Sequence, residues 1–464
     1  MNAAELDQSA ATVVALAEHF ERLKQRANEL IAEFHASTRG YFTPSEDEQT
    51  RQLLVSYWHA RNALFELVSG LHESNAGTED RRRDPRVVLT AYAGALALVD
   101  VARFLRHNFH HRPVVRAKLN EPEPAFGIPA GTYDLVQKSL TRPVHVWHLY
   151  HAMQFVNQHT AELKELCAGN GRMEAVLALV QTLQNQMDVT VERYVLTRVR
   201  VRAGSLREKL SRDLLGKALY SLQKCVSSLI ADRYIRSGHQ PALPDAIADE
   251  VERLLEPGDV IVVRKEHAFT NYFLPGYWPH AALYLGSTDQ MQKSRLHEHS
   301  NIAKHWSRLL DTDPLRPTRV LESMKDGVRI RSLSNPFRSD AIAVIRPTLQ
   351  PTQIAEAIGR GFQHTDKAYD FDFDFSRSDR LVCTEVVYRT YDNVAGIQFE
   401  LTRRAGRLTL SAEDLLQMAV DDRSFRPIAV YCPALGSTIT QEEEARAALQ
   451  KTIGRKSVPP SAGG

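Results

Sequence analysis

The spacing of apolar residues changes once along this chain, and that change limits the folds open to it. Up to about residue 240, apolar residues recur at three- and four-residue steps, as between Leu16 and Leu30, which is the period of one helix face. Beyond residue 240, β-branched runs follow turn residues, as where Val260–Val263 follows Pro257-Gly258-Asp259. We therefore predict an α+β protein in which an all-α helical bundle precedes a region that mixes strands and helices.

Turn and linker residues divide the chain into three predicted parts. The segment His239–Pro244 contains two prolines and is typical of a linker. We predict a helical bundle domain over 1–240, a mixed domain over 245–434, and a C-terminal tail over 435–464 that is partly disordered. In the bundle, we expect helices over 53–71, 87–104, 144–166, 173–199 and 206–235. In the mixed domain, we expect strands at 260–263, 281–285, 319–323, 328–333 and 341–346, and helices at 245–255, 351–362 and 384–394.

Composition excludes several classes of protein. Lys and Arg number 58 against 56 Asp and Glu, so no excess of positive charge predicts a nucleic-acid partner. Four cysteines with no Cys-x-x-Cys spacing predict neither a disulfide framework nor a structural zinc site, and no cofactor is indicated. Met1–Asp7 lacks the features of a secretory signal, and the most apolar stretch, Leu89–Val99, is too short to span a bilayer. We expect a cytoplasmic protein without a transmembrane segment.

Cys383 is the first candidate for chemistry, because it stands where a helix is predicted to begin. Free N–H groups and the helix dipole at that position favour a thiolate and can also hold an oxyanion. An arbitrary cysteine in an apolar run is more often inert core. We predict that inert role for the other three cysteines, Cys167, Cys225 and Cys432.

Two further residues could complete a nucleophilic site. His280 follows Trp278-Pro279 and opens a predicted strand, so its ring can be aimed at a helix N-terminus. Glu322 lies on the next predicted strand and could orient the imidazole. Each has a plain structural alternative: a partly buried histidine with satisfied hydrogen bonds, and a solvated carboxylate at a strand end.

The order of these motifs resembles the permuted papain-like amidase (YiiX-like) family of the NlpC-type cysteine peptidase superfamily, which is related to the lecithin retinol acyltransferase-like enzymes. The histidine precedes the cysteine in that family, as His280 precedes Cys383 here, and the resemblance covers about 250–434. It implies a circularly permuted papain-like domain with an antiparallel sheet packed on helices. It also implies Cys383 as nucleophile, His280 as base and Glu322 as the group that orients the base.

Three neighbouring residues are candidates for the oxyanion or for support: Tyr369, Thr384 and Glu385. Structural support is the more common role for each. The sequence departs from the family where Pro279-His280-Ala281 stands in place of Ser-His-Val, and where Thr384 replaces a serine after the cysteine. Both changes leave the required chemistry intact.

The motifs therefore predict a cysteine-dependent hydrolase or acyltransferase that cleaves an amide, ester or thioester through an acyl-enzyme on Cys383. The substrate would be a small molecule, a lipid or a peptide amide, and the aromatic stretch Phe273–Trp278 could form an apolar rim. The alternative is a non-catalytic scaffold with a papain-like binding module. The apolar helix faces of the N-terminal region leave open a homodimer through that region.

The segment 287–317 separates the strands of His280 and Glu322 and contains His297, His299 and His305. A metal site there is disfavoured because no carboxylate or cysteine stands at a ligand spacing. We expect instead a flexible cap over the site.

Overall fold

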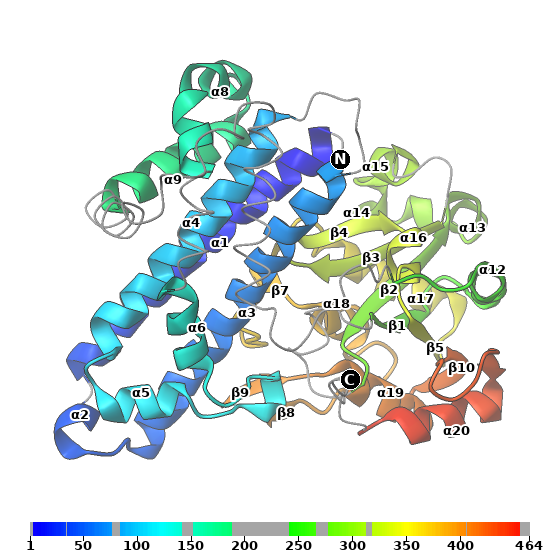
Figure 1. The fold of residues 1–464 in the computed structure, drawn as a ribbon. Helices are drawn as coiled ribbons and strands as arrows, with labels where there is room; N and C mark the ends of the chain where they lie inside the picture. The colour runs from blue at the N-terminus through cyan, green and yellow to red at the C-terminus, as the bar shows by residue number, and fades with distance from the viewer. Residues whose placement is uncertain are drawn as a thin grey trace. The chain divides into compact units, whose positions relative to one another are not determined.

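The computed structural model describes residues 3–33, 35–76, 84–141, 152–187, 241–265, 277–311, 318–404 and 406–454. It divides into two compact units (Figure 1). The helical unit takes its described residues from the chain up to Glu123 and from Pro129 to residue 187. The sheet unit contains Pro124–Ile128, which includes the short helix η1 (Pro124–Phe126), and the described residues from 241 onward. Each unit is described by itself.

Long helices that pack on one another form the centre of the helical unit. Its described helices are α1 (Ala3–Glu33), α2 (Ala36–Arg39), α3 (Pro44–Ala76), α4 (Pro85–Phe109), α5 (Pro113–Leu119), α6 (Thr132–Thr141), α8 (Thr160–Cys167) and α9 (Gly171–Met187). Helix α4 packs against α1, α3 and α9. A Cβ at Gly94 would lie 2.8 Å from Val68 Cγ2, so glycine allows α3 and α4 to approach closely at this point. The parts of the predicted helices over 144–151, 188–199 and 206–235 lie outside the described residues.

Helix α4 is the apolar centre of this unit. By length and composition alone, it could cross a membrane, but 78% of its most apolar window is buried in the structure. That burial is also what a core helix of a globular unit shows, so the helix is only weak support for a membrane span. Its start follows from local chemistry: Asp84 accepts the Arg86 N–H at 2.9 Å, and Pro85 occupies the first helical position.

A seven-stranded sheet in the order β11-β10-β5-β1-β2-β3-β4 forms the centre of the sheet unit, and all its neighbouring strands are antiparallel. Its strands are β1 (Val260–Arg264), β2 (His280–Ser287), β3 (Thr318–Met324), β4 (Gly327–Ser332), β5 (Ala341–Pro347), β10 (Phe425–Tyr431) and β11 (Thr440–Gln441). The described helices of this unit are α12 (Asp245–Leu254), α13 (Thr288–Lys293), α14 (Ser300–Ala303), α15 (Trp306–Asp311), α16 (Ser334–Phe337), α17 (Pro351–Phe362), α18 (Cys383–Tyr391), α19 (Ala412–Val420) and α20 (Glu442–Thr452), with the 3₁₀ turn η3 (Leu296–Glu298). Two small sheets pair β6 (Ala368–Tyr369) with β7 (Arg380–Leu381), and β8 (Thr402–Arg404) with β9 (Arg407–Thr409). This arrangement confirms the predicted α+β class, with an antiparallel sheet packed on helices.

Helices cover the sheet on both faces because its central strands are apolar on both sides. On one face, Ile261, Tyr284 and Val320 belong to a core cluster that includes side chains of α12 and α16. On the other face, α17 and α18 pack where Leu283 and Leu321 point, since alternate strand residues face opposite ways. Strand β1 is buried on both faces of the sheet, which explains why its residues form an unbroken apolar run.

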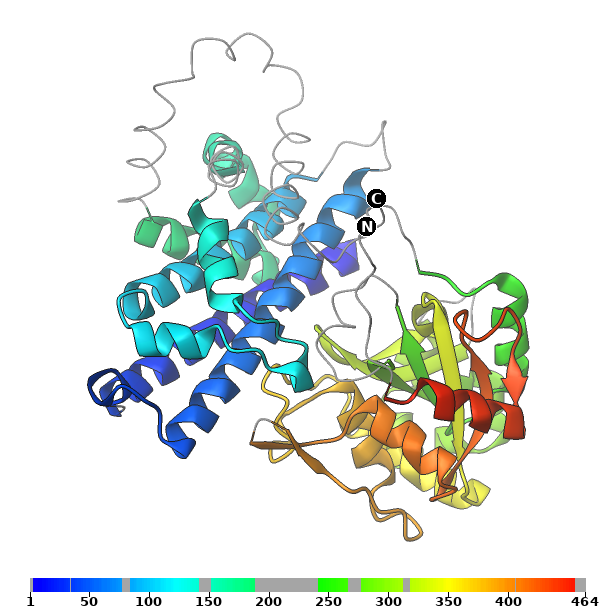
Figure 2. The ribbon, with the colours of Figure 1, turned by 60° about the horizontal axis from the view of Figure 1, so that its bottom comes forward.

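The segment 435–454 differs from the partly disordered tail that we predicted. Strand β11 adds to the edge of the sheet, and α20, red in Figure 2, packs on β10 and α19. The helix buries a narrow stripe formed by Ala445, Ala448, Leu449 and Thr452, while its first turn is acidic and exposed. Residues 455–464 lie outside the described residues.

The C-terminal end of α18 is held at two points. The Tyr391 hydroxyl donates to the Gly258 carbonyl in the turn before β1, where Gly258 has a φ of +96°. A Cβ at Gly361 of α17 would lie 2.7 Å from Thr390 Oγ1, so the two helices are in close contact there. The turn itself is fixed by Asp259, which accepts two hydrogen bonds from the Arg346 guanidinium at 2.7 and 2.8 Å.

The histidine-rich segment between β2 and β3, which we expected to be a flexible cap over the site, is largely helical where the structure describes it. It forms α13, η3, α14 and α15, and α13 begins at the end of β2 opposite to His280. Eight strand residues separate those two ends by roughly 20 Å. Helix α14 packs on α17, where the His299 ring lies against Gly359. The segment therefore begins at the far end of the sheet, and a cap over the site stays a prediction, because residues 312–317 lie outside the described residues.

Candidate active site

Cys383 is the first residue of α18, as its sequence context predicts. The N-cap residue is Val382, whose side chain offers no acceptor, and the first helical hydrogen bond is Val386 N to Val382 O at 3.2 Å. The N–H groups of the first turn before Val386 therefore have no acceptor within the helix. The Thr384 N–H and the Ala281 N–H of β2 donate to the Cys383 sulfur.

His280 and Glu322 lie on adjacent strands and share one side of the sheet. In the β2–β3 register, Leu283 opposes Leu321, so the Glu322 side chain is diagonal to that of His280. The His280 Nε2 and Glu322 Oε2 atoms are 2.7 Å apart. His280 also makes a side-chain hydrogen bond with Cys383, and Nδ1 is the ring nitrogen left for it. The structure thus brings together the three residues that the sequence singled out, and their catalytic roles stay a prediction.

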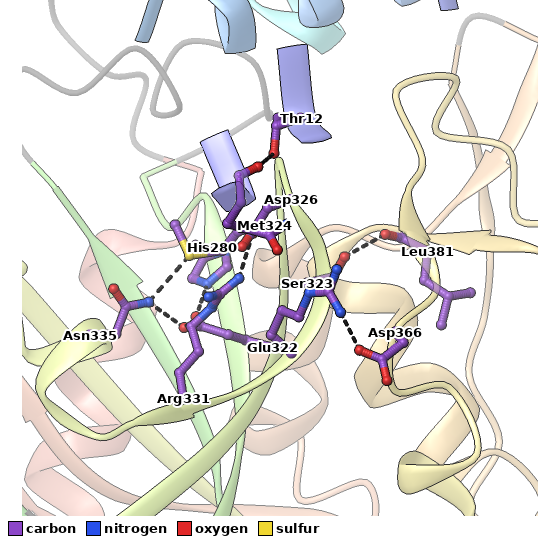
Figure 3. A network of polar contacts seen from close by, with 12 residues as sticks. Thr12, His280, Glu322, Ser323, Met324, Asp326, Arg331, Asn335, Asp366 and Leu381 are labelled. Atoms are coloured by element: carbon purple, nitrogen blue, oxygen red, sulfur yellow. Dashed lines mark hydrogen bonds and ion pairs between the residues drawn. The ribbon is translucent and has the colours of Figure 1, made fainter. Parts of the chain in front are cut away.

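Glu322 has two further partners that the sequence did not suggest. The Asn335 amide donates to Glu322 Oε1, and Arg331 Nε lies 3.4 Å from the same oxygen (Figure 3). Asn335 belongs to the four-residue helix α16, and Arg331 belongs to β4, where Asp326 holds its guanidinium at 2.5 Å. Glu322 is fully buried, and its hydrogen bonds with His280 and Asn335, with the ion pair to Arg331, compensate the burial of its charge. No local sequence pattern marks Asn335, because its position depends on how α16 returns to β3.

Electrostatics of the three groups favour a charged pair of thiolate and imidazolium. Burial raises the pKa of Cys383, but the His280 ring and the two N–H donors outweigh it and bring the pKa below that of an ordinary thiol. Burial lowers the pKa of His280, but Cys383 and Glu322 outweigh it and raise the pKa to about 9. Burial also raises the pKa of Glu322, and the hydrogen bond with His280 outweighs it and lowers the pKa to about 2. All three shifts therefore act in the direction of a thiolate, an imidazolium and a carboxylate.

The three predicted supporting residues have different surroundings. The Tyr369 ring packs 4.9 Å from Phe371 and 6.2 Å from Phe373, which is the structural role left open for it. Thr384 is buried and contributes its backbone N–H to the sulfur. Glu385 is buried and pairs with the Arg389 guanidinium at 2.6 Å.

A second buried carboxyl lies near Glu385. Asp370 accepts the Asp372 and Asp374 N–H groups at 3.1 and 2.6 Å, and so holds the loop that precedes β7. Burial raises the pKa of Asp370 to about 7, and Asp372 adds to the rise. Burial raises the pKa of Glu385 to about 8, although Arg389 opposes the rise.

The carboxyls of Asp370 and Glu385 should make the free energy of unfolding decrease as the pH rises. The pKa of each in the folded protein lies above the ordinary carboxyl value of about 4, so the folded state holds more protons between about pH 4 and pH 8. The free energy of unfolding should therefore decrease across that window, as measured by urea denaturation at several pH values. Asp370→Asn should make this dependence shallower. Asp379→Asn, at an exposed position, should not. A wild-type profile that is flat from pH 5 to pH 8 would contradict the expectation.

Asn335 should act as a positioning residue through Glu322. Asn335→Ala removes a donor to a buried carboxylate, so we expect roughly a tenfold lower rate of Cys383 alkylation at pH 6, because the His280 pKa falls with a less well-held Glu322. The measurement is iodoacetamide labelling followed by peptide mass spectrometry, which needs no substrate. The matched control is Asn301→Ala, whose amide donates to Gly359 O at 3.2 Å on α17. If both variants label at the wild-type rate, Asn335 does not position the site.

The other residues singled out by sequence take structural positions. Cys167 is fully buried, and burial raises its pKa, while Cys432 lies 3.2 Å from the Tyr277 hydroxyl. Cys225 lies outside the described residues, as do Phe273–Gly276 of the predicted apolar rim. Trp278 is fully buried and donates from Nε1 to Thr452 Oγ1 at 3.1 Å. For Tyr277 and Trp278, therefore, the rim interpretation is wrong, and both belong to the core of the sheet unit.

The histidines of the segment between β2 and β3 also pack or hydrogen-bond locally. The His297 ring lies 5.6 Å from that of Trp306, and His299 Nδ1 accepts the Asn301 N–H. Among the residues that the structure describes, no group of three or more His, Cys, Asp or Glu side chains is placed to hold a metal ion.

Comparison with known families gives one match. Residues 254–442, less than half of the chain, match the family described as "permuted papain-like amidase enzyme, YaeF/YiiX, C92 family". No curated protein and no solved structure matches the chain. The matched segment runs from the end of α12 to the start of α20, so it contains Cys383, His280 and Glu322 and accounts for the permuted papain-like fold around them. Over residues 254–442, the sheet unit of this chain is therefore similar to the permuted papain-like amidase family.

Proposed function

We propose that this protein hydrolyses or transfers an acyl group through a thioester formed on Cys383. The observation that carries the proposal is the continuous line of contacts from the Cys383 sulfur through His280 to Glu322 at the start of a helix. A nucleophile, a base and a group that orients the base, beside free N–H donors, are the parts that acyl transfer requires.

The first half of the reaction forms the acyl-enzyme. The Cys383 thiolate attacks the carbonyl carbon of an amide, ester or thioester, and the carbonyl oxygen becomes an oxyanion. The Cys383 N–H, which has no acceptor within α18, is a candidate donor to that oxyanion. The imidazolium of His280 then gives its proton to the departing nitrogen, oxygen or sulfur as the carbon–heteroatom bond breaks. A thioester on Cys383 and a neutral His280 result.

The second half returns the enzyme to its resting form. Neutral His280 takes a proton from water, or from an acceptor alcohol or amine, and the oxygen or nitrogen of that molecule attacks the thioester carbon. The acyl group leaves as an acid, ester or amide, and the thiolate and imidazolium are restored. Glu322 keeps the ring oriented and stabilises its positive charge through the 2.7 Å hydrogen bond. Water gives hydrolysis, and a second acceptor gives acyl transfer.

The test is activity-based profiling of the full-length protein with a panel of acyl amides, acyl esters and lipid substrates. Cys383 is only 2% exposed, so a small electrophile such as iodoacetamide is the first probe and fluorophosphonate-sized reagents follow. We expect turnover of at least one substrate class, with an acylated Cys383 peptide trapped by mass spectrometry. Product analysis in the presence of an added amine or alcohol separates hydrolysis from transfer.

The non-catalytic scaffold gives a different outcome in the same experiment. A papain-like binding module would show no preferential alkylation of Cys383 over Cys432 at pH 6, and it would bind panel members without turnover. Full labelling at Cys383 together with a thioester adduct supports the enzyme. Absence of both would overturn the proposal.

A further inference from the structure

Helix α3 buries an arginine that pairs with no carboxylate in the part of the chain that the structure describes. Arg61 is 4% exposed, and its partners are neutral: Nη1 donates to Asn62 Oδ1 at 3.1 Å, and the Tyr57 side chain makes a second hydrogen bond. The Arg61 Cζ atom also lies 4.3 Å from the centre of the Phe65 ring and 5.2 Å from that of Trp58. A buried charge that no opposite charge balances is costly, so this arrangement indicates a missing anion.

Two neutral donors next to Arg61 also lack an acceptor. Asn62 is 2% exposed and Trp58 is 8% exposed, and neither Asn62 Nδ2 nor Trp58 Nε1 has a hydrogen-bond partner among the described residues. Because the same amide accepts from Arg61 through Oδ1, Nδ2 lies close to the guanidinium. Arg61 and Asn62 follow Trp58 by three and four positions, so the three side chains share one side of the helix. Buried donors without an acceptor indicate a bound water or ion, and the adjacent positive charge favours an anion.

The Tyr57 phenol does not supply the missing negative charge. Burial raises the pKa of Tyr57 to about 12, although Arg61 opposes the rise, so the phenol keeps its proton at neutral pH. Burial lowers the pKa of Arg61, and Tyr57 opposes that change. A guanidinium nevertheless stays protonated in proteins. A positive charge therefore remains on this side of α3, and no described residue offsets it.

From these observations, we propose that α3 of the helical unit binds a halide ion such as chloride, held by the Arg61 guanidinium and the Asn62 amide N–H beside the Trp58 ring. One negative charge balances the one guanidinium. A monatomic anion is also the smallest class of anion, which suits side chains that are at most 8% exposed, whereas phosphate would bring four oxygens and a second charge. The site lies in the helical unit and does not depend on the proposed acyl chemistry.

The experiment compares thermal unfolding of the full-length protein, followed by circular dichroism, in sodium chloride and in sodium gluconate at equal concentrations. Gluconate keeps the ionic strength constant and is too large for the proposed site. With a dissociation constant of about 10 mM and chloride at about 200 mM, the wild type should unfold about 4 °C higher in chloride. Bromide should have the same effect as chloride. As an independent measurement, the protein should broaden the chlorine-35 NMR signal of chloride, and added bromide should reverse the broadening.

Two variants remove the need for the ion in different ways. Arg61→Met removes the positive charge, and Asn62→Asp places a carboxylate of the same shape against the guanidinium. Each should unfold at the same temperature in the two salts and should leave the chloride signal narrow. In gluconate, Asn62→Asp should unfold at a higher temperature than the wild type, because the chain then supplies its own counter-charge. The control is Arg26→Gln, at an exposed arginine of α1 that pairs with Glu29 at 3.0 Å, and it should keep the chloride effect.

Two results would overturn the proposal. If the wild type unfolds at the same temperature in chloride and gluconate, water rather than an anion satisfies the donors. If Arg61→Met and Asn62→Asp keep the chloride effect, the ion binds elsewhere on the protein. Should Arg61→Met fail to fold, Asn62→Asp decides the matter alone, since it keeps both the arginine and the shape of the neighbouring side chain.

Discussion

Replacing Cys383 by alanine is expected to lower turnover of any acyl substrate by at least roughly 10⁴-fold, because no covalent intermediate can then form. Substrate binding should be little affected, since the first-turn N–H groups of α18 belong to the backbone and stay in place. The measurement is steady-state hydrolysis of the best substrate from the acyl panel, with binding followed by titration. Cys383→Ser tests the same point with a poorer nucleophile of similar size.

Two other cysteines provide controls for this prediction. Cys167 and Cys432 are buried, and neither touches His280 in the structure, so Cys167→Ala and Cys432→Ala should keep most of the wild-type turnover. Loss of alkylation in either variant with Cys383 intact would assign the nucleophile to another residue. Retention of more than about 1% of turnover in Cys383→Ala would rule out covalent catalysis at this position.

Changing His280 to glutamine is expected to give the second large effect. The amide of glutamine can still donate to Glu322, so the buried carboxylate keeps a partner, but the imidazolium that stabilises the thiolate is gone. The Cys383 pKa should then rise to at least the ordinary thiol value of about 8.5. Alkylation at pH 6 should slow by on the order of 100-fold, and turnover should fall by roughly 10³-fold or more.

The pH profile of alkylation separates this effect from misfolding. In the wild type, the rate should level off at a lower pH than in His280→Gln, where it should rise about tenfold per pH unit up to the higher thiol pKa. Wild-type turnover should decrease above about pH 9, as the imidazolium of His280 loses its proton. His297→Gln is the control, because that ring lies against Trp306 on the segment between β2 and β3. Parallel profiles for wild type and His280→Gln would show that the thiolate does not depend on this histidine.

The strands and the three site residues could be predicted from sequence because their signals are local. Val260–Val263 is a β-branched run after a Pro-Gly turn, and it forms β1 with one additional residue. Cys383 was placed at a helix start by the apolar pattern that follows it, and α18 begins there. The order of short motifs then linked Cys383, His280 and Glu322 before any distance was known.

Features that depend on which distant segments of the chain pack together could not be predicted from the sequence. Helix α20 begins with three glutamates and buries only a narrow stripe in which Leu449 is the one large apolar side chain, so its composition indicates a solvated tail rather than part of a core. Asn335 reaches Glu322 only because α16 follows the β3–β4 hairpin back across the sheet. The length of β2 decides where the segment after it begins, because His280 at the first residue of the strand and α13 after its last residue lie far apart.

The contacts at the C-terminal end of α18 help to set the position of the nucleophile at its first residue. Tyr391 and Thr390 hold the far end against Gly258 and Gly361, while Cys383 is the first residue of the helix, eight positions before Tyr391. A nine-residue helix is about 13 Å long, so a tilt of about 5° about the far end would move the sulfur by about 1 Å. A displacement of that size can cost roughly 100-fold in rate. Small substitutions at these contacts, which touch no substrate, would therefore alter the geometry of the thiolate more than their distance from it suggests.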